Sequence, residues 1–418
     1  MPPTGAARSA ALPIDVPVLL YIDAAVIGGS TNYTVMLAAG LRRRGHRVSV
    51  ICKSRVALEP MREKLRAADV EVLSVDSGDF TMMGRARRLA RFLKLLRSRR
   101  GSVLLLLMGY FHGGGPLGVA ARLAGVRIVL RADLQPPMPP ISWWERSTAA
   151  LKDRLFDLFI VGAEENARSY SRLLGRDRRR LRVIHTGIAL DEYRPGEGRD
   201  DARAELGVLT DELLVGVVSR IGDDWERKGI GVLLEALPEI ERQRPETRFV
   251  IVGDGSTRWK HEKEVRALGL ADRVSFAGWR PDVTRLLAAM DVFVMPSTFE
   301  GGPTTVIEAM AMARPIVATG VGMVPEILRD GVNGIVIEPS SSAALVASTV
   351  RLLADPDLRA RLGLEAGVAA AGLGIEDMVD RYVNVCGELW WARKPPPLRA
   401  RASTLSRQSS DRRTTPRT

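Results

Sequence analysis

The segment FEGGPTTVIEAMAMARPIVAT contains two glutamates, Glu300 and Glu308, that lie eight residues apart. A glycine-rich loop and the start of an expected helix separate them: Gly301, Gly302, Pro303, Thr304 and Thr305. Peptide N–H groups in such a loop and at a helix start can bind phosphate and sugar oxygens, because they are unpaired and the helix dipole favours negative charge. Glu300 can accept hydrogen bonds from sugar hydroxyls, and Glu308, one turn inside the helix, can accept both hydroxyls of a ribose. A helix-capping role for Glu300 is the alternative.

Two cations occupy a similar position in another strand–loop–helix segment, VVSRIGDDWERKGIGVLLEAL. Arg220 ends the expected strand, and Lys228 with Gly229 opens the next helix. Two cations beside a helix N-terminus can hold a diphosphate and offset the charge on a departing nucleoside diphosphate. The alternative is a pair of solvated surface charges, which is also our expectation for Arg227.

A third candidate is the turn Gly28-Gly29-Ser30-Thr31, which follows the strand Val18–Ile22 and precedes a helix expected over Asn32–Arg44. Such a turn brings backbone N–H groups close to a phosphate, with Gly29 beneath it. Doubly wound proteins also turn tightly here for packing reasons, so both interpretations stay open.

Other residues could contact an acceptor or a metal. His112, in GYFHGGG, is expected to end a strand at the cleft, where it could touch acceptor or donor. The proline-rich segment 135–147, with Trp143 and Trp144, is typical of an acceptor loop, a membrane-interface contact or domain packing. The D-x-D triplet at 355–357 reads as a turn between helices, and no metal site is expected.

Short apolar runs alternate with helical patterns through most of the chain and must position these residues. The first series of expected strands is Val16–Ile22, Arg47–Cys52, Val103–Met108, Arg127–Leu130, Leu158–Val161 and Arg182–Ile184. The second series is Leu213–Ser219, Arg248–Gly253, Val274–Ala277, Val292–Met295, Pro315–Ala318 and Gly334–Ile337. Strands separated by helices imply parallel sheets covered on both faces. The fold class is therefore α/β, with two doubly wound Rossmann-like domains facing across a cleft, as suits 418 residues.

The seam between the domains falls near Asp191–Asp211, which is polar, contains Pro and Gly, and precedes a new strand. The final helix carries Trp390 and Trp391, which should dock on another surface. The predicted segments are a flexible N-terminus over 1–15, a first domain over 16–205 and a second domain over 206–374. A helix over 375–392 is expected to pack back on the first domain, and a disordered basic tail follows over 393–418.

The formal charge of +12 is regional. Segment 84–100 holds eight basic residues and no acid, the tail from Arg393 holds eight and one Asp, and the rest of the chain carries about −3. Segment 84–100 has an apolar stripe under its cations, which indicates a helix packed on its own domain, adhesion to an anionic membrane, or both. Nucleic-acid binding is not expected, because no reader motif accompanies the charge.

The chain is expected to be cytoplasmic, either free or peripheral on the inner face of a membrane. Two cysteines cannot form a disulfide framework, and a reducing compartment fits them. Residues 1–17 lack the long apolar core of a signal peptide, and the longest apolar run, Val103–Met108, is too short to span a bilayer.

FEGGPTTVIEAMA resembles the E-x7-E signature of retaining glycosyltransferases of the GT-B fold, family four. Other similar phrases are GHRVSVI, VIHTGIALDEYRP, VGDGSTRWKHEKEVRALGLADRVSFAGWRPDV and VATGVGMVPEILRDGVNGIVIEP. The resemblance covers roughly residues 16–372 and is more specific in the C-terminal half. It implies that the first domain binds the acceptor and the second a nucleotide diphosphate sugar.

The resemblance also implies roles for individual residues. Glu300 would contact the donor sugar, Glu308 the ribose, and Arg220 with Lys228 the diphosphate. Gly29 would lie under the phosphates, and the backbone around Trp279 and Arg280 would border the base. The reaction would need no cofactor, metal or protein nucleophile, because the leaving phosphate can take the acceptor's proton. The acceptor would be lipid-linked, a glycan or a small molecule.

The sequence departs from this family at several positions. The family commonly has a histidine that faces the donor sugar's outer hydroxyl, and this sequence has Ala132 at that position. Asp133 or Arg131 could take the role of that histidine. We hypothesise that the donor lacks a 6-hydroxyl. Other departures are His185 and Thr186 for Pro and Asn, and Met323 for Gly. Two alternatives follow: a nucleotide-sugar epimerase, against which the E-x7-E motif argues, and a non-catalytic nucleotide-sugar-binding protein.

Overall fold

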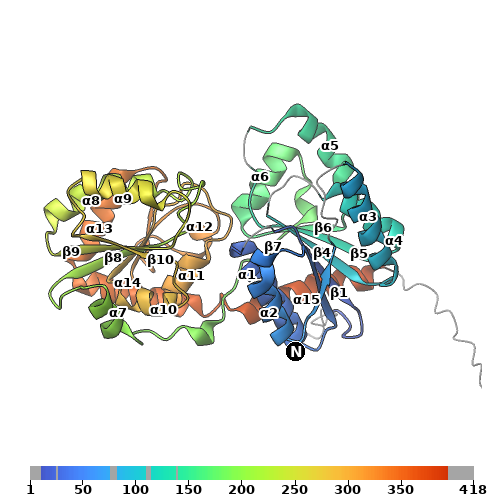
Figure 1. Ribbon diagram of the computed structural model, residues 1–418, viewed down its shortest axis with the longest axis horizontal. Helices are drawn as coiled ribbons and strands as arrows, with labels where there is room; N and C mark the ends of the chain where they lie inside the picture. The colour runs from blue at the N-terminus through green and yellow to red at the C-terminus, as the bar shows by residue number, and fades with distance from the viewer. Residues whose placement is uncertain (1–10, 25–26, 76–81, 110–113, 138–139, 394–418) are drawn as a thin grey trace, which may run out of the picture.

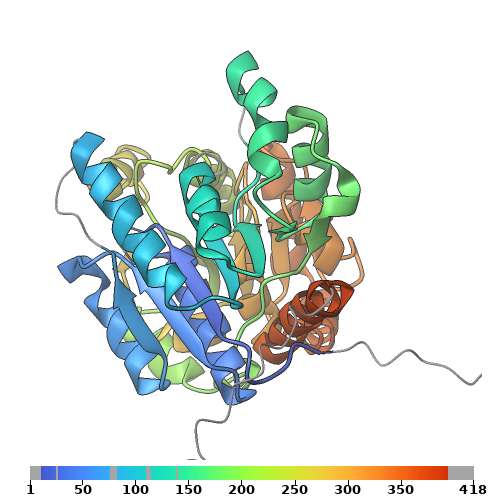
Figure 2. The ribbon, with the colours of Figure 1, turned by 90° about the vertical axis from the view of Figure 1, so that its right-hand side faces the viewer.

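Two parallel sheets organise the chain, and the elements around each form a separate layered unit (Figure 1). In Figure 2 the unit around the first sheet faces the viewer. This computed structural model describes residues 11–24, 27–75, 82–109, 114–137 and 140–393. Within those residues every strand pairing between named strands is parallel. We call the unit around the first sheet the N-terminal domain and the unit around the second sheet the C-terminal domain.

The N-terminal domain has the strand order β3-β2-β1-β4-β5-β6-β7. Its strands are β1 Val18–Ile22, β2 Val48–Cys52, β3 Glu71–Ser74, β4 Val103–Met108, β5 Ile128–Asp133, β6 Leu158–Val161 and β7 Leu181–Val183. Its helices are α1 Gly29–Arg43, α2 Glu59–Ala67, α3 Met82–Arg97, α4 Gly115–Ala124, α5 Trp143–Asp153 and α6 Glu164–Leu174, with short 3-10 turns at Val56–Leu58 and Arg178–Arg180. Helices α1 and α2 cover one face of the sheet, and α3 to α6 cover the other.

The C-terminal domain has the strand order β10-β9-β8-β11-β12-β13. Its strands are β8 Leu213–Val218, β9 Thr247–Val252, β10 Val274–Gly278, β11 Val292–Met295, β12 Ile316–Thr319 and β13 Ile335–Ile337. Its helices are α7 Arg199–Glu205, α8 Ile230–Gln243, α9 Arg258–Ala267, α10 Val283–Ala289, α11 Thr304–Ala311, α12 Val324–Ile327, α13 Ser342–Ala354 and α14 Pro356–Ala370. Both faces of the sheet are covered by apolar side chains, which explains the near-continuous apolar strands.

The strand predictions were right within about two residues, with two informative exceptions. The edge strand β3 was missed because its residues are only partly buried and polar residues lie at both ends. Strand β5 continues to Asp133 instead of ending at Leu130. The polar side chains of Arg131 and Asp133 suggested a strand end, but they are buried as an ion pair, with 2.6 Å between Arg131 Nε and Asp133 Oδ1.

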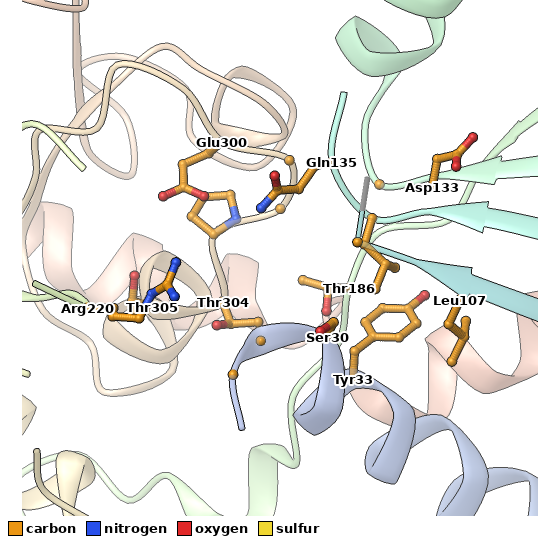
Figure 3. A pocket seen from close by; sticks show the side chains of 18 of the residues that line it. Ser30, Tyr33, Leu107, Asp133, Gln135, Thr186, Arg220, Glu300, Thr304 and Thr305 are labelled. Atoms are coloured by element: carbon orange, nitrogen blue, oxygen red, sulfur yellow. The ribbon is translucent and has the colours of Figure 1, made fainter. Parts of the chain in front are cut away.

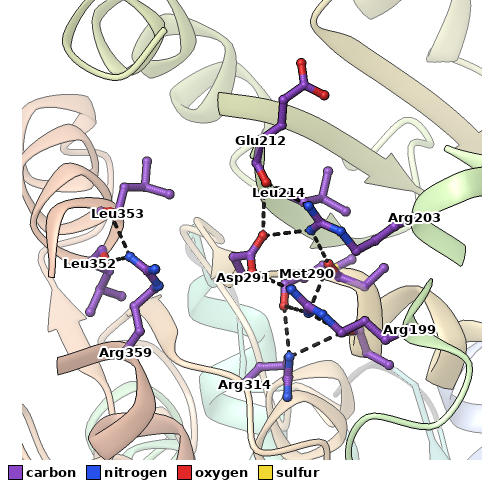
Figure 4. Close-up of polar contacts among 12 residues, drawn as sticks. Arg199, Arg203, Glu212, Leu214, Met290, Asp291, Arg314, Leu352, Leu353 and Arg359 are labelled. Atoms are coloured by element: carbon purple, nitrogen blue, oxygen red, sulfur yellow. Dashed lines mark hydrogen bonds and ion pairs between the residues drawn. The ribbon is translucent and has the colours of Figure 1, made fainter. Parts of the chain in front are cut away.

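The boundary between the domains lies before α7, not at 205/206. Helix α7 packs on α10 of the C-terminal domain, with Ala202 in that core. Two arginines of α7 hold it there: Arg199 and Arg203 both bind Asp291, at 2.6 and 2.9 Å, and Asp291 also accepts from the Leu214 N–H (Figure 4). Burying a carboxylate requires such partners, and Asp291 has three.

The last helix, α15 Ile375–Ala392, crosses back and packs on α1 of the N-terminal domain (Figure 1). Gly40 permits this contact, because a Cβ there would overlap Val379. The hydroxyls of Tyr33 and Tyr382 are 2.7 Å apart. Of the two terminal indoles, Trp390 lies under the Arg127 guanidinium, 3.7 Å from the ring centroid, whereas Trp391 is exposed.

Candidate functional site

A cavity of about 550 Å³ lies where the two domains meet, and residues of both line it (Figure 3). Its walls come from the carboxyl ends of strands in both sheets and from the start of α1. In doubly wound proteins this end of a parallel sheet is where loops converge and ligands bind. The cavity brings together these predicted site residues: Gly29, Asp133, Arg220, Lys228, Glu300, Gly301, Gly302, Pro303, Thr304 and Thr305.

The first turn of α1 presents bare backbone to the cavity. The helix begins at Gly29, three residues before the predicted start, because the Thr31 hydroxyl accepts from the Gly28 N–H at 2.8 Å and donates to its carbonyl at 2.7 Å. A Cβ at Gly28 or Gly29 would meet no atom within 4 Å. Among the described residues the N–H groups of Gly29 and Ser30 have no hydrogen-bond partner, so they are available to an anionic ligand, which the helix dipole also favours.

Both candidate cations are paired with carboxylates. Lys228 Nζ lies 2.6 Å from Glu300 Oε1, which also accepts from the Ser297 hydroxyl at 3.1 Å. Arg220 Nη2 lies 2.6 Å from Asp224 Oδ2. Next to Lys228, Gly229 has φ +66° and forms the N-cap of α8, and a Cβ there would overlap the Pro296 carbonyl. This close approach is what puts Lys228 beside the end of β11 and Glu300.

Arg227 is not the solvated surface charge that we expected. Its Nη2 lies 2.8 Å from Asp224 Oδ2, and its Nη1 reaches Gln135 Oε1 of the N-terminal domain at 3.4 Å. The arginine thus helps to orient the carboxylate that pairs with Arg220. The segment offered no sign of this role, because the partner Gln135 is 92 residues away in the chain.

The loop between the two glutamates is held between the domains. A Cβ at Gly301 would overlap the Leu134 carbonyl of the N-terminal domain, and the Asn166 side chain donates to the Gly301 carbonyl at 3.3 Å. A Cβ at Gly302 would lie 3.3 Å from Met323 Sδ. Thr304 and Thr305 begin α11 as predicted and face the cavity. A side chain at position 301 would collide with backbone of the N-terminal domain, so this contact requires glycine there.

Glu308 lies one turn into α11 and is not among the residues that line the cavity. Burial raises its pKa to about 7, although a hydrogen bond with Tyr193 opposes the rise. Burial, followed by the nearby Glu308 carboxylate, raises the pKa of the Tyr193 hydroxyl. Tyr193 follows the crossing between the domains and was missed as a site residue. Its signal was the EYRP phrase at that crossing.

Several predicted residues are not part of the cavity lining. The Trp279 side chain is 72% exposed, and Arg280 pairs with Asp282 at 2.7 Å and with Glu205. The prediction for these two concerned their backbone and stays a prediction. His112 lies outside the described residues.

Asp133 is among the residues that line the cavity, but its carboxylate is held in ion pairs. Figure 3 shows it directed away from the other labelled side chains. One of its oxygens accepts from Arg131 at 2.6 Å and the other from Arg176 at 3.1 Å. Arg176 in turn binds Asp153 at 2.9 Å. Asp133 and Arg131 therefore belong to a buried ion-pair network at the cavity wall, and contacting a donor sugar in place of the histidine would compete with these ion pairs.

Ala132 lies in the cavity wall, among apolar side chains of the N-terminal domain that include Ile22, Leu107 and Ile160. Among the described residues no group of His, Cys, Asp and Glu side chains has the arrangement of a metal site. The described helices also include none with the length and apolar character needed to cross a membrane.

Comparisons with known proteins agree with this architecture. A family model described as "Glycosyl transferases group 1" matches residues 212–355, and one described as "Glycosyl transferase 4-like domain" matches 28–187. The D-inositol 3-phosphate glycosyltransferase of Nocardia farcinica is 29% identical over 91% of both chains. The alpha-D-kanosaminyltransferase of Streptomyces kanamyceticus is 30% identical over 60% of this chain and 64% of its own.

Solved structures with the same fold include Anabaena HepE in complex with UDP and glucose, with a TM-score of 0.76 at 21% identity. That match covers 88% of this chain and 98% of HepE. WaaG, a glycosyltransferase involved in lipopolysaccharide biosynthesis, has a TM-score of 0.67 at 20% identity, over 89% of this chain and 99% of WaaG. The chain belongs to the group 1 glycosyltransferases and has the GT-B fold. It is an enzyme that transfers a sugar from a nucleotide-sugar donor.

Proposed function

We propose that the enzyme transfers the sugar with retention of configuration, and without a metal ion or other cofactor, from a nucleoside diphosphate donor bound between the domains. One observation carries this proposal: the open start of α1, the cations Arg220 and Lys228 and the Glu300 loop converge on one cavity. Positive charge and unpaired N–H groups then surround the position of the leaving diphosphate, the task that a metal ion performs in other transferases.

The residues divide the work between binding and charge stabilisation. Arg220, Lys228 and the α1 backbone at Gly29 hold the diphosphate, while Glu300 binds the sugar and Glu308 the ribose. The bond between the anomeric carbon and the phosphate oxygen breaks, and a bond to the acceptor oxygen forms on the same face. The acceptor's proton passes to a phosphate oxygen of the leaving group. Positioning and electrostatic stabilisation supply the rate enhancement.

We further propose that the donor sugar lacks a 6-hydroxyl, as a deoxy sugar or a pentose does. Ala132 and its neighbours Leu107 and Ile160 offer no side-chain polar atom in that part of the wall. A hydroxyl placed against this surface would lose water without gaining a partner, which costs about 1–3 kcal/mol. A steady-state preference for an ordinary hexose donor would contradict the idea.

The acceptor binds at the N-terminal domain, and we propose a sugar, lipid-linked glycan or small molecule, with the enzyme in the cytoplasm at a membrane surface. Support for the membrane comes from α3, where Arg91, Lys94 and Arg97 are exposed. Phe92 and Leu96 of the same helix are buried in the domain, so electrostatic attraction is what α3 can contribute.

Two exposed indoles could complete this membrane contact. Trp143 and Trp144 form the first turn of α5, not a loop, and are 73% and 61% exposed. Tryptophan favours the headgroup region of a bilayer. Co-sedimentation with vesicles of anionic lipid, compared with neutral vesicles, tests the contact. Equal binding to both, or none, would contradict it.

The donor site is tested by thermal shift against UDP, GDP, ADP, TDP and their sugar conjugates without metal. A ligand that binds only the folded state raises its apparent stability. We expect a shift with one base that is lost in Arg220→Ala and Glu308→Ala. Binding without turnover on many acceptors would favour a non-catalytic protein, and NMR of the product anomer would decide between retention and inversion.

A further inference from the structure

A single carboxylate of the C-terminal domain binds two groups of the N-terminal domain at the edge of the cavity. Glu326, in α12, accepts from the backbone N–H of Glu164 through Oε1 at 2.7 Å. Its Oε2 lies 2.8 Å from His185 Nε2. Both side chains are only 22% exposed, so the pair is shielded from most of the solvent. The contact joins residues that are 141 and 162 positions apart in the chain.

Helix α6 depends on this carboxylate for its first turn. Its N-cap is Ala163, which has no side-chain oxygen with which to accept from the unpaired N–H groups. The Glu326 carboxylate, which belongs to the C-terminal domain, accepts from the Glu164 N–H instead. Burial opposes ionisation of Glu326, but hydrogen bonds from His185 and from the backbone of Glu164 and Glu165 hold its pKa below the ordinary value. Separating the domains would therefore leave a helix uncapped and a carboxylate without partners.

The same elements contact the loop that carries Glu300. Asn166, in the first turn of α6, donates to the Gly301 carbonyl at 3.3 Å. Gly322, just before α12, has φ +57°, and a Cβ there would lie 2.6 Å from the Glu300 carbonyl. Helix α6, α12 and the Glu300 loop thus form one continuous cluster across the domain boundary.

The covalent connections between the domains lie elsewhere. Gly187 and Ile188, in the first crossing, run beside Leu373 to Ile375 of the returning chain, with Ile188 N donating to the Leu373 carbonyl at 3.2 Å and Ile375 N to the Ile188 carbonyl at 2.8 Å. These two crossing segments connect the domains, and Ile188 and Gly374 form an isolated β-bridge between them. The contacts of Glu326 with His185 and Glu164 are additional, non-covalent links between the domains.

We propose that Glu326 and His185 form an interdomain latch that holds the domains at the separation at which α1 and the Glu300 loop act on one donor. Both are positioning residues: they act through α6 and the loop and touch no substrate. The inference rests on the proposed donor site only for its kinetic readout. His185, which departs from the family's usual Pro, gains a function by this assignment.

The test compares Glu326→Ala with the wild type by small-angle X-ray scattering and by steady-state kinetics with the donor found in the thermal-shift panel. We expect a larger radius of gyration in Glu326→Ala and a kcat/KM for the donor that falls ~10-fold, because hydrogen bonds to a charged group are lost. The lower kcat/KM should come mainly from a higher KM, because the residues proposed to contact the donor are unchanged in this variant. Glu365→Ala removes an exposed glutamate of α14 and is the matched control.

Two further variants separate a latch from a simple helix cap. Glu326→Gln keeps an oxygen for the α6 N–H groups, so it should retain the wild-type melting temperature more than Glu326→Ala does while still weakening the His185 contact. His185→Ala should increase the radius of gyration and the KM for the sugar donor. His185→Gln keeps a hydrogen-bond donor, so both values should lie between those of His185→Ala and the wild type.

The proposal is overturned if Glu326→Ala lowers only the melting temperature and leaves the radius of gyration and KM at the wild-type values. Scattering requires no ligand. If no nucleotide binds the wild type, the proposed function fails while the scattering comparison still decides the latch.

Discussion

The two walls of the cavity differ in chemistry. The C-terminal domain contributes charged groups in compensated pairs, Lys228 with Glu300 and Arg220 with Asp224. The N-terminal domain contributes a wall with much apolar surface, including Ile22, Leu107 and Ile160, beside the bare backbone of α1.

This contrast separates two tasks. Charged pairs can exchange partners when a diphosphate arrives, so they suit the part of the donor where negative charge develops. An apolar wall discriminates between ligands by their shape, and it disfavours ligands whose polar groups would be left without hydrogen-bond partners. The family resemblance in the sequence is also more specific in the C-terminal half than in the N-terminal half.

The largest effect should come from removing a charge on the C-terminal wall. Lys228→Met should lower kcat by ~10²–10³, the usual cost of losing one stabilising group for developing charge. Arg242→Met removes an exposed cation of α8 that pairs with Glu239 at 2.6 Å and should leave kcat unchanged. Stopped assays of nucleoside diphosphate release measure both. Equal activity in the two variants would erase the contrast between the walls.

Two glycines of α1 should respond differently to the same substitution. Gly29→Val places a side chain in open cavity space and should raise the donor KM ~100-fold with little change in melting temperature. Gly40→Val meets Val379 of α15 and should destabilise the fold by about 1–3 kcal/mol without touching the site. Calorimetry and kinetics on both variants separate binding from packing. If Gly29→Val were destabilised and Gly40→Val were not, the first turn of α1 would not be open to the cavity.

The raised pKa of Glu308 gives a pH signature. Since the folded state binds this proton more tightly than the unfolded chain, its stabilising effect is complete below pH ~4.5 and disappears as pH rises through about 7. The ligand-free enzyme should lose up to about 3 kcal/mol over this window. Glu308→Gln should flatten that part of the profile in urea unfolding series. A profile identical to the wild type would show that Glu308 is ionised throughout.

The smallest effect should come from the N-terminal wall. Ala132→His adds a hydrogen-bond donor and should shift the kcat/KM ratio by ~5-fold towards donors with a 6-hydroxyl, as one net hydrogen bond implies. Ala132→Leu fills similar space without a polar atom and serves as the control. If both variants shift the ratio equally, volume and not polarity governs donor choice.

Much of the fold could be predicted from local pattern. The apolar runs gave strands such as Val103–Met108, Leu158–Val161 and Val292–Met295 with their final bounds, because a strand buried on both faces must be apolar throughout. The same reasoning failed at Arg131 and Asp133, whose burial depends on Arg176 and Asp153 far along the chain. It also placed α7 in the wrong domain, since Arg199 and Arg203 find Asp291 only after folding.

The sequence by itself determined that glycine-rich turns, two cations and two glutamates would lie at the ends of strands, because motif spacing fixes which residues share a strand–loop–helix segment. Only the tertiary structure decided how the two domains join these segments. Pairs such as Lys228 with Glu300, Arg227 with Gln135, and Glu326 with His185 link residues 72 to 141 positions apart. No local pattern encodes them: Lys228 and Glu300 follow neighbouring strands of one sheet, and the other two pairs depend on how closely the two domains lie.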